Sequence, residues 1–495
     1  MFLDGKWTKP GRHLYETRNP ATGEVVGRFT QGDADDVERA VAAARKAFPG
    51  WARTPPPRRA QILLEATRIF RERKKELGKL VAQEMGKVLA EAEGDVQEAI
   101  DFFEYIAGEG RRMFGETTTS ELPRKFNMWI RRPKGAVALI TPWNFPIAIP
   151  SWKGGAALVA GCTVVFKPAS STSLCGIRFA EVLQDAGLPP GVFNLVTGPG
   201  GTVGNAIVEH PGIRHVSFTG GVPTGREVLA KAAPTIKSVH LELGGKNAQI
   251  VMEDANLELA LDGVLFGAFG TAGQRCTATS RLVLHEDVYD EFLERLTKRA
   301  EGLKLGDPTD PRSDVGPVHG GAQEKKILEY IGIGKKEGAR LVTGGHKVDL
   351  KGALKDGHFI EPTIFEAKHG MRITKEEIFG PVLSVLRVRD FDEAVDVAND
   401  VEFGLSSSIY TRNVNRAFLA VERLEAGITY VNAPTIGAEV HLPFGGIKNT
   451  GNGGREAGTT AIEGFTDIKS VFIDYSDRLQ KAQIDTEAVW RKEGA

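Results

Sequence analysis

A cysteine and a glutamate, each beside glycines, are the residues of this chain best suited to chemistry. Cys276 lies in the segment 270–278, where Gly270 and Gly273 permit a tight turn. Glu242 ends an apolar run and is followed by two glycines. A thiol is a strong nucleophile as a thiolate, and a carboxylate can serve as the base that helps to form it. This pair predicts covalent chemistry at a carbonyl carbon.

Both residues also have a plainer interpretation. A lone cysteine is most often an inert core residue, and this interpretation suits Cys162 and Cys175. Glu242 could instead be a structural charge paired with Lys246. The glycine-rich turn favours a functional role for Cys276, because it exposes the sulfur and leaves room for a carbonyl group.

The composition is that of an ordinary soluble globular protein. The 495 residues are 41% hydrophobic and 26% charged, and 63 basic residues balance 64 acidic ones, so neither nucleic acid nor a membrane surface is expected as a partner. The charged N-terminus is not typical of a signal peptide, and no apolar run is long enough to span a membrane. Three cysteines make no disulfide framework, so we expect a reducing, cytoplasmic location.

The hydrophobic pattern predicts helices first and then an alternation of strands and helices. Residues 33–49 and 57–114 are predicted to be helical. From residue 135 short apolar runs alternate with helical segments, which predicts a doubly wound parallel sheet. Its predicted strands are 136–140, 163–166, 192–196, 215–218 and 239–243, and its predicted helices are 174–186, 202–209 and 224–233.

The alternation starts again after residues 246–248, which predicts a second α/β unit. Its predicted strands are 249–252, 282–284, 382–386, 407–410 and 428–431, and its predicted helices are 257–269, 287–303, 324–337, 391–399 and 414–424. Because Glu242 precedes this boundary and Cys276 follows it, a site that uses both would lie in a cleft between two lobes.

Two glycine-rich turns, at 198–204 and 218–225, follow predicted strands and precede predicted helices. The helix N-terminus at such a turn can bind a phosphate. Neither turn has the Gly-x-Gly-x-x-Gly spacing of the dinucleotide fingerprint. Taken alone, each is explained as well by a plain turn as by a nucleotide site.

Seven motifs together resemble those of the aldehyde dehydrogenase superfamily, in the family's order and over residues 5–475. They are 142–146, 166–169, 218–220, 242–246, 273–276, 377–382 and 444–446. The resemblance implies an α/β fold with a Rossmann-type cofactor lobe, a second α/β catalytic lobe and a small oligomerisation arm. The implied division is a dinucleotide-binding domain at 1–114 and 134–247, a catalytic domain at 248–447, an arm at 115–133 and 465–477, and a polar tail at 478–495.

The resemblance further implies NAD(P)-dependent oxidation of an aldehyde to a carboxylic acid. Cys276 would form a thiohemiacetal and then a thioester, and the Asn144 amide would bind the oxyanion together with the Cys276 backbone N–H. Glu242 would activate the water that releases the acid. Lys153 and Glu456 match positions implicated in proton relay, and no metal ion is expected.

The implied cofactor is NADP, NAD or both. The residues that match cofactor-binding positions are Trp143, Lys167, Ser170, Gly200, Gly204, Thr219, Gly220, Gly221, Leu243, Glu377 and Phe379. Lys167 resembles the residue that binds the adenosine ribose, and Glu377 the one that binds the nicotinamide ribose. Members that prefer NAD often carry glutamate at the position of Ser170, so its neutral hydroxyl predicts good use of NADP.

Residues near the nucleophile bear on the choice of aldehyde. Arg275 is either part of a structural ion pair or a bidentate clamp for a substrate carboxylate. Phe145, Trp152 and Phe444 match aromatic pocket positions. The segments 273–281, 432–439 and 444–456 resemble those of 2,5-dioxopentanoate (α-ketoglutaric semialdehyde) and α-aminoadipic semialdehyde dehydrogenases. A carboxylated semialdehyde is therefore the predicted substrate, with a broad-specificity aldehyde dehydrogenase as the alternative.

Other classes are less well supported by the residues. A cysteine hydrolase or acyltransferase without nicotinamide would use the same thiol, but His215 and His240 lie inside predicted strands and no histidine falls in a catalytic motif. CoA-acylating relatives usually lack the glutamate that Glu242 provides. An inactive binding protein would not need Asn144, Glu242 and Cys276 together. The resemblance also implies a homo-oligomer, a dimer or a tetramer, in which the arm adds a strand to a neighbour's sheet.

Overall fold

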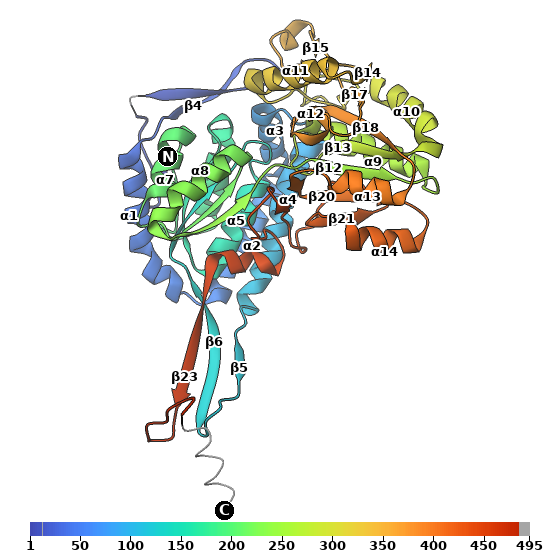
Figure 1. Ribbon diagram of the computed structural model, residues 1–495. Helices are drawn as coiled ribbons and strands as arrows, with labels where there is room; N and C mark the ends of the chain where they lie inside the picture. Colours follow the sequence, from blue (N-terminus) through green and yellow to red (C-terminus); the bar gives the residue numbers. More distant parts are fainter. Residues whose placement is uncertain (12, 485–495) are drawn as a thin grey trace, which may run out of the picture.

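The computed structural model describes residues 1–11 and 13–484. Each half of the body contains a seven-stranded sheet covered by helices, and a narrow three-stranded arm projects away from both (Figure 1). The predicted α/β class is confirmed, since most neighbouring strands of the two large sheets run parallel. Within the described residues no helix is long and apolar enough to cross a membrane.

The first sheet contains all five strands predicted after residue 135. In sheet order its strands are β11 (Ser238–Glu242), β10 (His215–Thr219), β7 (Ala136–Ile140), β8 (Thr163–Lys167), β9 (Phe193–Leu195), β1 (Phe2–Leu3) and β2 (Lys6–Trp7). The two N-terminal strands were not predicted, because two residues give no alternation to read. The carboxyl ends of β7, β8, β10 and β11 meet at one edge, where ligands bind in such sheets.

The second sheet contains the five strands predicted after residue 248 and two more at its far edge. In sheet order they are β14 (Arg340–Thr343), β17 (Thr363–Glu366), β18 (Val382–Val388), β13 (Thr279–His285), β12 (Asn247–Val251), β20 (Ser406–Tyr410) and β21 (Ile428–Val431). Its main helices are α9 (Leu257–Phe269), α10 (Glu286–Glu301), α11 (Gly320–Lys336), α13 (Phe391–Asn399) and α14 (Val414–Arg423). The bounds of α9 and α13 agree with the prediction.

The prediction of continuous helix over 57–114 is wrong. After α1 (Ala34–Arg53), three separate helices follow, which are α2 (Pro56–Glu72), α3 (Lys74–Met85) and α4 (Leu89–Gly108). Gly86 ends α3 with φ of 102°, a left-handed conformation that glycine adopts readily. Arg73 leaves helical geometry between α2 and α3.

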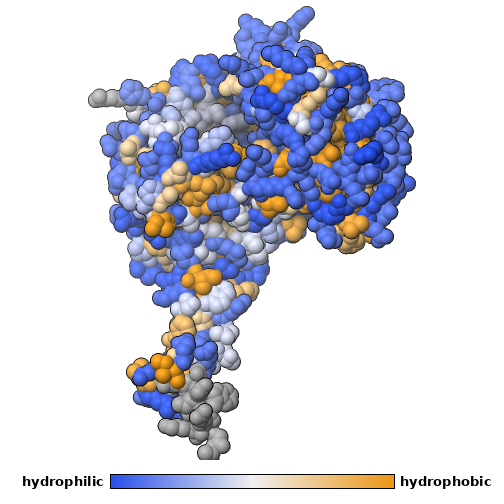
Figure 2. Space-filling view, in the orientation of Figure 1, coloured by the Kyte–Doolittle hydropathy of each residue, from blue (hydrophilic) through white to orange (hydrophobic). Residues whose placement is uncertain are grey.

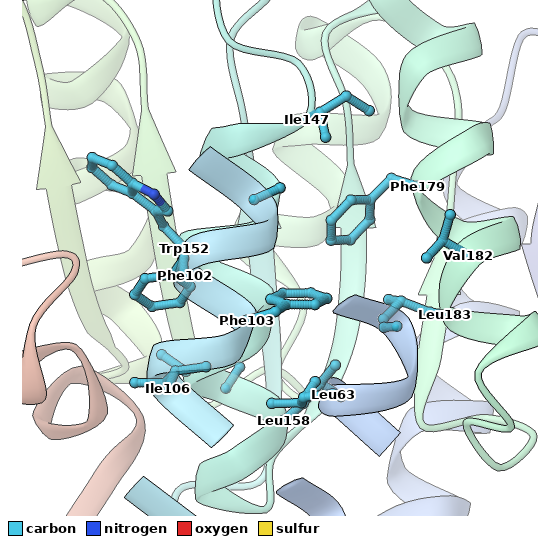
Figure 3. Close-up of a cluster of buried hydrophobic side chains, with 14 of the residues drawn as sticks. Leu63, Phe102, Phe103, Ile106, Ile147, Trp152, Leu158, Phe179, Val182 and Leu183 are labelled. Atoms are coloured by element: carbon cyan, nitrogen blue, oxygen red, sulfur yellow. The ribbon is translucent and has the colours of Figure 1, made fainter. Parts of the chain in front are cut away.

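A helix that the sequence did not reveal lies at the centre of the first core. Every residue of α5 (Ala148–Ala160) is buried, so the segment has no polar face and no amphipathic pattern. Figure 3 shows it meeting α2, α4 and α6 (Ser173–Asp185) through apolar side chains. The labelled members of this cluster are Leu63, Phe102, Phe103, Ile106, Ile147, Trp152, Leu158, Phe179, Val182 and Leu183. This packing fixes the helix that carries Trp152 and Lys153.

Smaller elements complete the fold. The predicted helix at 202–209 is a π-helical turn, Gly200–Gly204, followed by α7 (Asn205–Glu209), and α8 (Val222–Ala232) follows β10. The remaining elements are β3 (Leu14–Arg18), β4 (Val25–Thr30), β15 (Lys347–Val348), β16 (Phe359–Ile360), α12 (Arg372–Lys375), β19 (Phe403–Gly404) and β22 (Ile447–Lys448).

The arm is an antiparallel sheet of β23 (Thr466–Asp474), β6 (Lys125–Pro133) and β5 (Glu116–Thr118). Figure 2 shows hydrophobic side chains on its surface, and Phe126, Ile468 and Phe472 are exposed. The predicted tail is described as far as residue 484, and residues 485–495 lie outside the described part of the chain.

Candidate functional site

The turn that carries Cys276 has an unusual backbone. Thr271, Ala272 and Gly273 all have positive φ, at 52°, 52° and 67°. A Cβ on Gly273 would collide with the backbone oxygen of Gly380, so only glycine fits there. The turn leaves Cys276 partly exposed, as the glycine pattern predicted, whereas Cys162 and Cys175 are fully buried.

Two cavities meet at Cys276. One has a volume of about 710 Å³ and is lined by Phe145, Trp152, Phe444, Arg275 and Glu242, among others. The other has a volume of about 1130 Å³ and extends along the carboxyl edge of the first sheet. The sulfur is therefore accessible to a small substrate from one cavity and to a second, larger ligand from the other.

Glu242 is the last residue of β11, and its side chain is buried beside the first cavity. Burial and the nearby Glu456 raise its pKa well above the ordinary value of a carboxyl. Its Oε1 lies 3.4 Å from His240 Nε2, and its Oε2 has no hydrogen-bond partner within residues 1–11 and 13–484. The predicted alternative, a pair with Lys246, does not form, since Lys246 Nζ also lacks a partner there.

Lys153 and Glu456 lie together beneath the same cavity. Lys153, on α5, is buried, donates to Glu456 Oε1 and also donates to Ser217 Oγ at 2.8 Å. Glu456 lines the cavity beside Glu242 and is held by backbone hydrogen bonds to Phe444. Lys153 thus connects Glu456, at the cavity wall, with Ser217 of strand β10.

The free thiol is held in its protonated form. Burial, then Glu242 and Glu377, raises the pKa of Cys276 to about 12. Asn144 is buried beside the larger cavity and donates from Nδ2 to the Gln274 oxygen at 3.1 Å. Because burial and two nearby carboxylates raise the pKa of Cys276, a base must take the proton when the sulfur reacts.

Most residues that match cofactor positions line the larger cavity. They are Trp143, Lys167, Gly200, Thr219, Gly220, Gly221, Leu243, Glu377 and Phe379. Gly204 is not among the lining residues but lies next to Lys167, since a Cβ added to Gly204 would lie 3.7 Å from Lys167 Cδ. Ser170 is close to the wall and donates from Oγ to the Gly198 oxygen at 2.8 Å.

The donors and acceptors of this cavity fit a dinucleotide. Thr219 Oγ1 is buried without a hydrogen-bond partner in the described part of the chain, which suits a ligand oxygen. Burial lowers the pKa of Lys167 to about 8, and its Nζ donates to the neighbouring Pro168 oxygen at 3.0 Å. Glu377 accepts from the Gly245 N–H at 2.9 Å, which aims the carboxylate along the cavity wall.

Arg275 forms the ion pair that was one of its two predicted roles. Its Nη2 lies 3.0 Å from Glu91 Oε1, and its Nε donates to Thr271 Oγ1 at 2.9 Å. The guanidinium lies near the rings of Phe145 and Phe266 and lines the substrate cavity. The ion pair orients the guanidinium toward Glu91, and a clamp on a substrate carboxylate stays a prediction.

Sequence reasoning missed three residues around the site. Glu98 lines the substrate cavity, and burial followed by Asp95 raises its pKa to about 8. Glu91 accepts from the Thr271 N–H in the turn that carries Cys276. The His319 ring stacks on Trp143, with ring centroids 4.3 Å apart. The acidic residues 91, 95 and 98 lie on one face of α4 together with buried apolar residues. Acidic residues on an apolar helix face are unusual, and this pattern in the sequence could have revealed Glu91 and Glu98.

Known proteins place these motifs in a family. The model of the aldehyde dehydrogenase family matches residues 7–471. "Alpha-ketoglutaric semialdehyde dehydrogenase" of Bacillus subtilis is 40% identical over 95% of this chain and 97% of its own. "Alpha-ketoglutarate semialdehyde dehydrogenase" of Haloferax volcanii is 44% identical over 96% of this chain and 98% of its own.

Solved structures agree. Betaine aldehyde dehydrogenase from Staphylococcus aureus in complex with NAD+ has a TM-score of 0.94 and 34% identity, and the match covers 97% of this chain and 96% of that one. A putative aldehyde dehydrogenase from Burkholderia cenocepacia has the same TM-score, with 36% identity over 97% of this chain and 98% of its own. The resemblance read from seven motifs is confirmed, and the chain belongs to the aldehyde dehydrogenase family.

Proposed function

We propose that this protein oxidises an aldehyde to a carboxylic acid through Cys276. The observation that carries the proposal is that two cavities, one with an aromatic lining and a larger one lined by the residues that match cofactor positions, meet at one partly exposed thiol. NAD(P), when bound, supplies the acceptor for the hydride of the aldehyde. The cofactor residues are those that line the larger cavity, with Glu377 and Lys167 for its two riboses.

The first half of the reaction uses the thiol and the Asn144 amide. Cys276 gives its proton to water in the cavity as the sulfur adds to the aldehyde carbon and forms a thiohemiacetal. The Asn144 Nδ2 and the Cys276 backbone N–H stabilise the negative oxygen. After oxidation the acyl group remains on Cys276 as a thioester.

The second half uses Glu242. The carboxylate accepts a proton from water as the water oxygen adds to the thioester carbon. The C–S bond then breaks, the acid leaves, and Glu242 returns the proton to the Cys276 sulfur. We propose that Glu456 and Lys153 relay protons to and from Glu242, because Glu456 lines the cavity beside Glu242 and accepts from Lys153.

The proposed substrate is a semialdehyde that carries a carboxylate. Arg275 is the only cation that lines the substrate cavity among the described residues, and the aromatic rings of Phe145, Trp152 and Phe444 suit an aliphatic chain. Since the pKa of Glu98 is raised to about 8, this carboxyl is largely neutral at pH 7 and does not repel an anion. Two relatives named for α-ketoglutaric semialdehyde support the same class.

Replacing Arg275 by alanine tests the substrate class. We expect KM for carboxylated semialdehydes to rise by about 10- to 10²-fold, because a charge-assisted hydrogen bond contributes roughly 1.5–3 kcal/mol. KM for propanal or hexanal should stay unchanged. Initial rates over a panel of aldehydes, with and without a terminal carboxylate, give both values. Equal effects on both groups would favour the broad-specificity alternative, and no reduced nicotinamide with any aldehyde would favour a cysteine hydrolase.

We also propose that the enzyme uses NADP well, beside NAD. Ser170 carries no negative charge and can turn its hydroxyl from the Gly198 oxygen toward a 2′-phosphate. Initial rates with each cofactor test this, and Ser170→Glu should lower kcat/KM for NADP by about tenfold or more through charge repulsion while sparing NAD. A strong preference of the unchanged enzyme for NAD over NADP would contradict this proposal.

The proposal also includes the domains of the chain and its oligomeric state. We infer a dinucleotide-binding domain at 1–114 and 134–247, a catalytic domain at 248–447 and an arm at 115–133 and 465–477. Within one chain β23 and β21 are both sheet edges, and edges with exposed apolar residues favour pairing between copies. A homodimer or homotetramer is therefore proposed, which a molar-mass measurement in solution would test. Three free cysteines fit a cytoplasmic location.

A further inference from the structure

The nucleophile turn adopts a backbone conformation that its sequence does not favour. Thr271 has φ 52° and ψ 28°, and Ala272 has φ 52° and ψ 37°. The left-handed region is unfavourable for residues with a Cβ and most of all for a β-branched residue such as threonine. Such a conformation persists only where surrounding contacts hold it.

One carboxylate on another helix supplies several of those contacts. Glu91, in the first turn of α4, accepts from the Thr271 backbone N–H at 3.0 and 2.9 Å and from Thr271 Oγ1 at 3.1 Å. It also accepts from Arg275 Nη2 at 3.0 Å. A Cβ on Gly270 would lie 2.9 Å from Glu91 Oε1, so the carboxylate packs directly on the backbone of the turn. Both carboxylate oxygens of Glu91 therefore contact residues within 270–275.

The turn held by Glu91 connects to two groups of the proposed reaction. Gln274 donates from Nε2 to the Thr271 oxygen at 3.1 Å, and its own backbone oxygen accepts from Asn144 Nδ2 at 3.1 Å. The His319 N–H donates to Gln274 Oε1 at 2.8 Å. A shift of Thr271 would therefore move Gln274, and with it both Cys276 and Asn144.

We propose that Glu91 is a positioning residue that holds the left-handed turn and thereby places Cys276 and Asn144 for attack on the aldehyde. It acts through Thr271 and Arg275 and does not line the substrate cavity. The inference rests on the proposed function in treating Cys276 as the nucleophile. It goes further in assigning a role to a carboxylate that is 180 residues away from the turn.

Two substitutions of Glu91 separate positioning from mere stability. Glu91→Ala removes every contact to the turn, whereas Glu91→Gln keeps an oxygen that can accept from the Thr271 N–H. Glu104→Gln is the matched control, since Glu104 is an exposed carboxylate on the same helix that pairs with Arg71. Complete alkylation counts the intact sites in each variant, because Cys162 and Cys175 are fully buried.

With hexanal, whose binding needs no charge, Glu91→Ala should lower kcat per titrated site by about 10²-fold with little change in KM. Glu91→Gln should recover most of that loss, and Glu104→Gln should equal the unchanged enzyme. A kcat per site in Glu91→Ala that equals the unchanged enzyme would overturn the proposal, even if the variant melted at a lower temperature.

A second measurement does not depend on aldehyde oxidation. The rate of Cys276 alkylation by iodoacetamide at neutral pH should rise by about tenfold or more in Glu91→Ala, because a released turn exposes the partly exposed thiol more fully and so lowers its raised pKa. The rate should stay near the original in Glu91→Gln and in Glu104→Gln. An unchanged alkylation rate in Glu91→Ala would overturn the positioning role, whereas an unchanged enzyme that oxidises no aldehyde would overturn the proposed function alone.

Discussion

Replacing Cys276 by serine is expected to abolish aldehyde oxidation while the cofactor still binds. The site already raises the pKa of the thiol to about 12 through burial and the nearby Glu242 and Glu377, so it disfavours an anion at this position. A serine hydroxyl is a far weaker acid than a thiol and would hardly ionise there. Loss of a nucleophile in other enzymes costs about 10⁴-fold or more in rate, and we expect a similar loss here.

The test of Cys276→Ser measures both the turnover rate and the affinity for the cofactor. The formation of reduced nicotinamide gives the rate, and quenching of protein fluorescence on titration with NAD(P) gives the affinity, since Trp143 lines the cofactor cavity. Cys162→Ser is the matched control, because Cys162 lines neither cavity and donates to the Phe465 oxygen, which a serine hydroxyl can also do. Turnover by Cys276→Ser near the original rate, or loss of turnover in Cys162→Ser, would contradict the assignment.

Much of the fold could be predicted because strands and amphipathic helices leave a periodic pattern. Helix α13 has polar residues along one face, and the mostly apolar α9 begins directly after Asn256, whose side chain caps it. The helix α5 could not be predicted in this way, since burial on all sides removes the period. The three helices between residues 56 and 108 were read as one, because each is amphipathic and only Gly86 marks a break.

The site residues that lie in local sequence motifs could be predicted, whereas those whose role depends on the fold could not. Cys276, Glu242 and Asn144 lie in local motifs, and the structure brings them to two adjoining cavities. Glu91 was missed because its role exists only once α4 packs against a turn 180 residues away. On the sequence alone a glutamate in a helix is read as a solvated charge, and nothing in the pattern of residues 89–108 links it to Thr271. The two interpretations of Arg275 stayed open for the same reason.

Replacing Glu242 by glutamine is expected to separate the two halves of the reaction. A glutamine cannot accept a proton from water, so the thioester on Cys276 should accumulate after one oxidation per site. Steady-state turnover should fall by about 10²- to 10⁴-fold, the range expected for a lost general base. Rapid-mixing experiments should give a burst of reduced nicotinamide, and mass spectrometry should find the acyl group on the peptide that contains Cys276.

The pH dependence of turnover provides an independent check on Glu242. Only the ionised carboxylate accepts a proton, and burial with the nearby Glu456 raises its pKa well above the usual value. Steady-state rates should therefore keep rising with pH beyond the range where an ordinary carboxyl is already ionised, and this rise should be absent in Glu242→Gln. Glu463→Gln, at an exposed carboxylate paired with Arg131, is the control. An equal loss of burst and steady-state rate would mean that Glu242 acts on the thiol and leaves the water to another base.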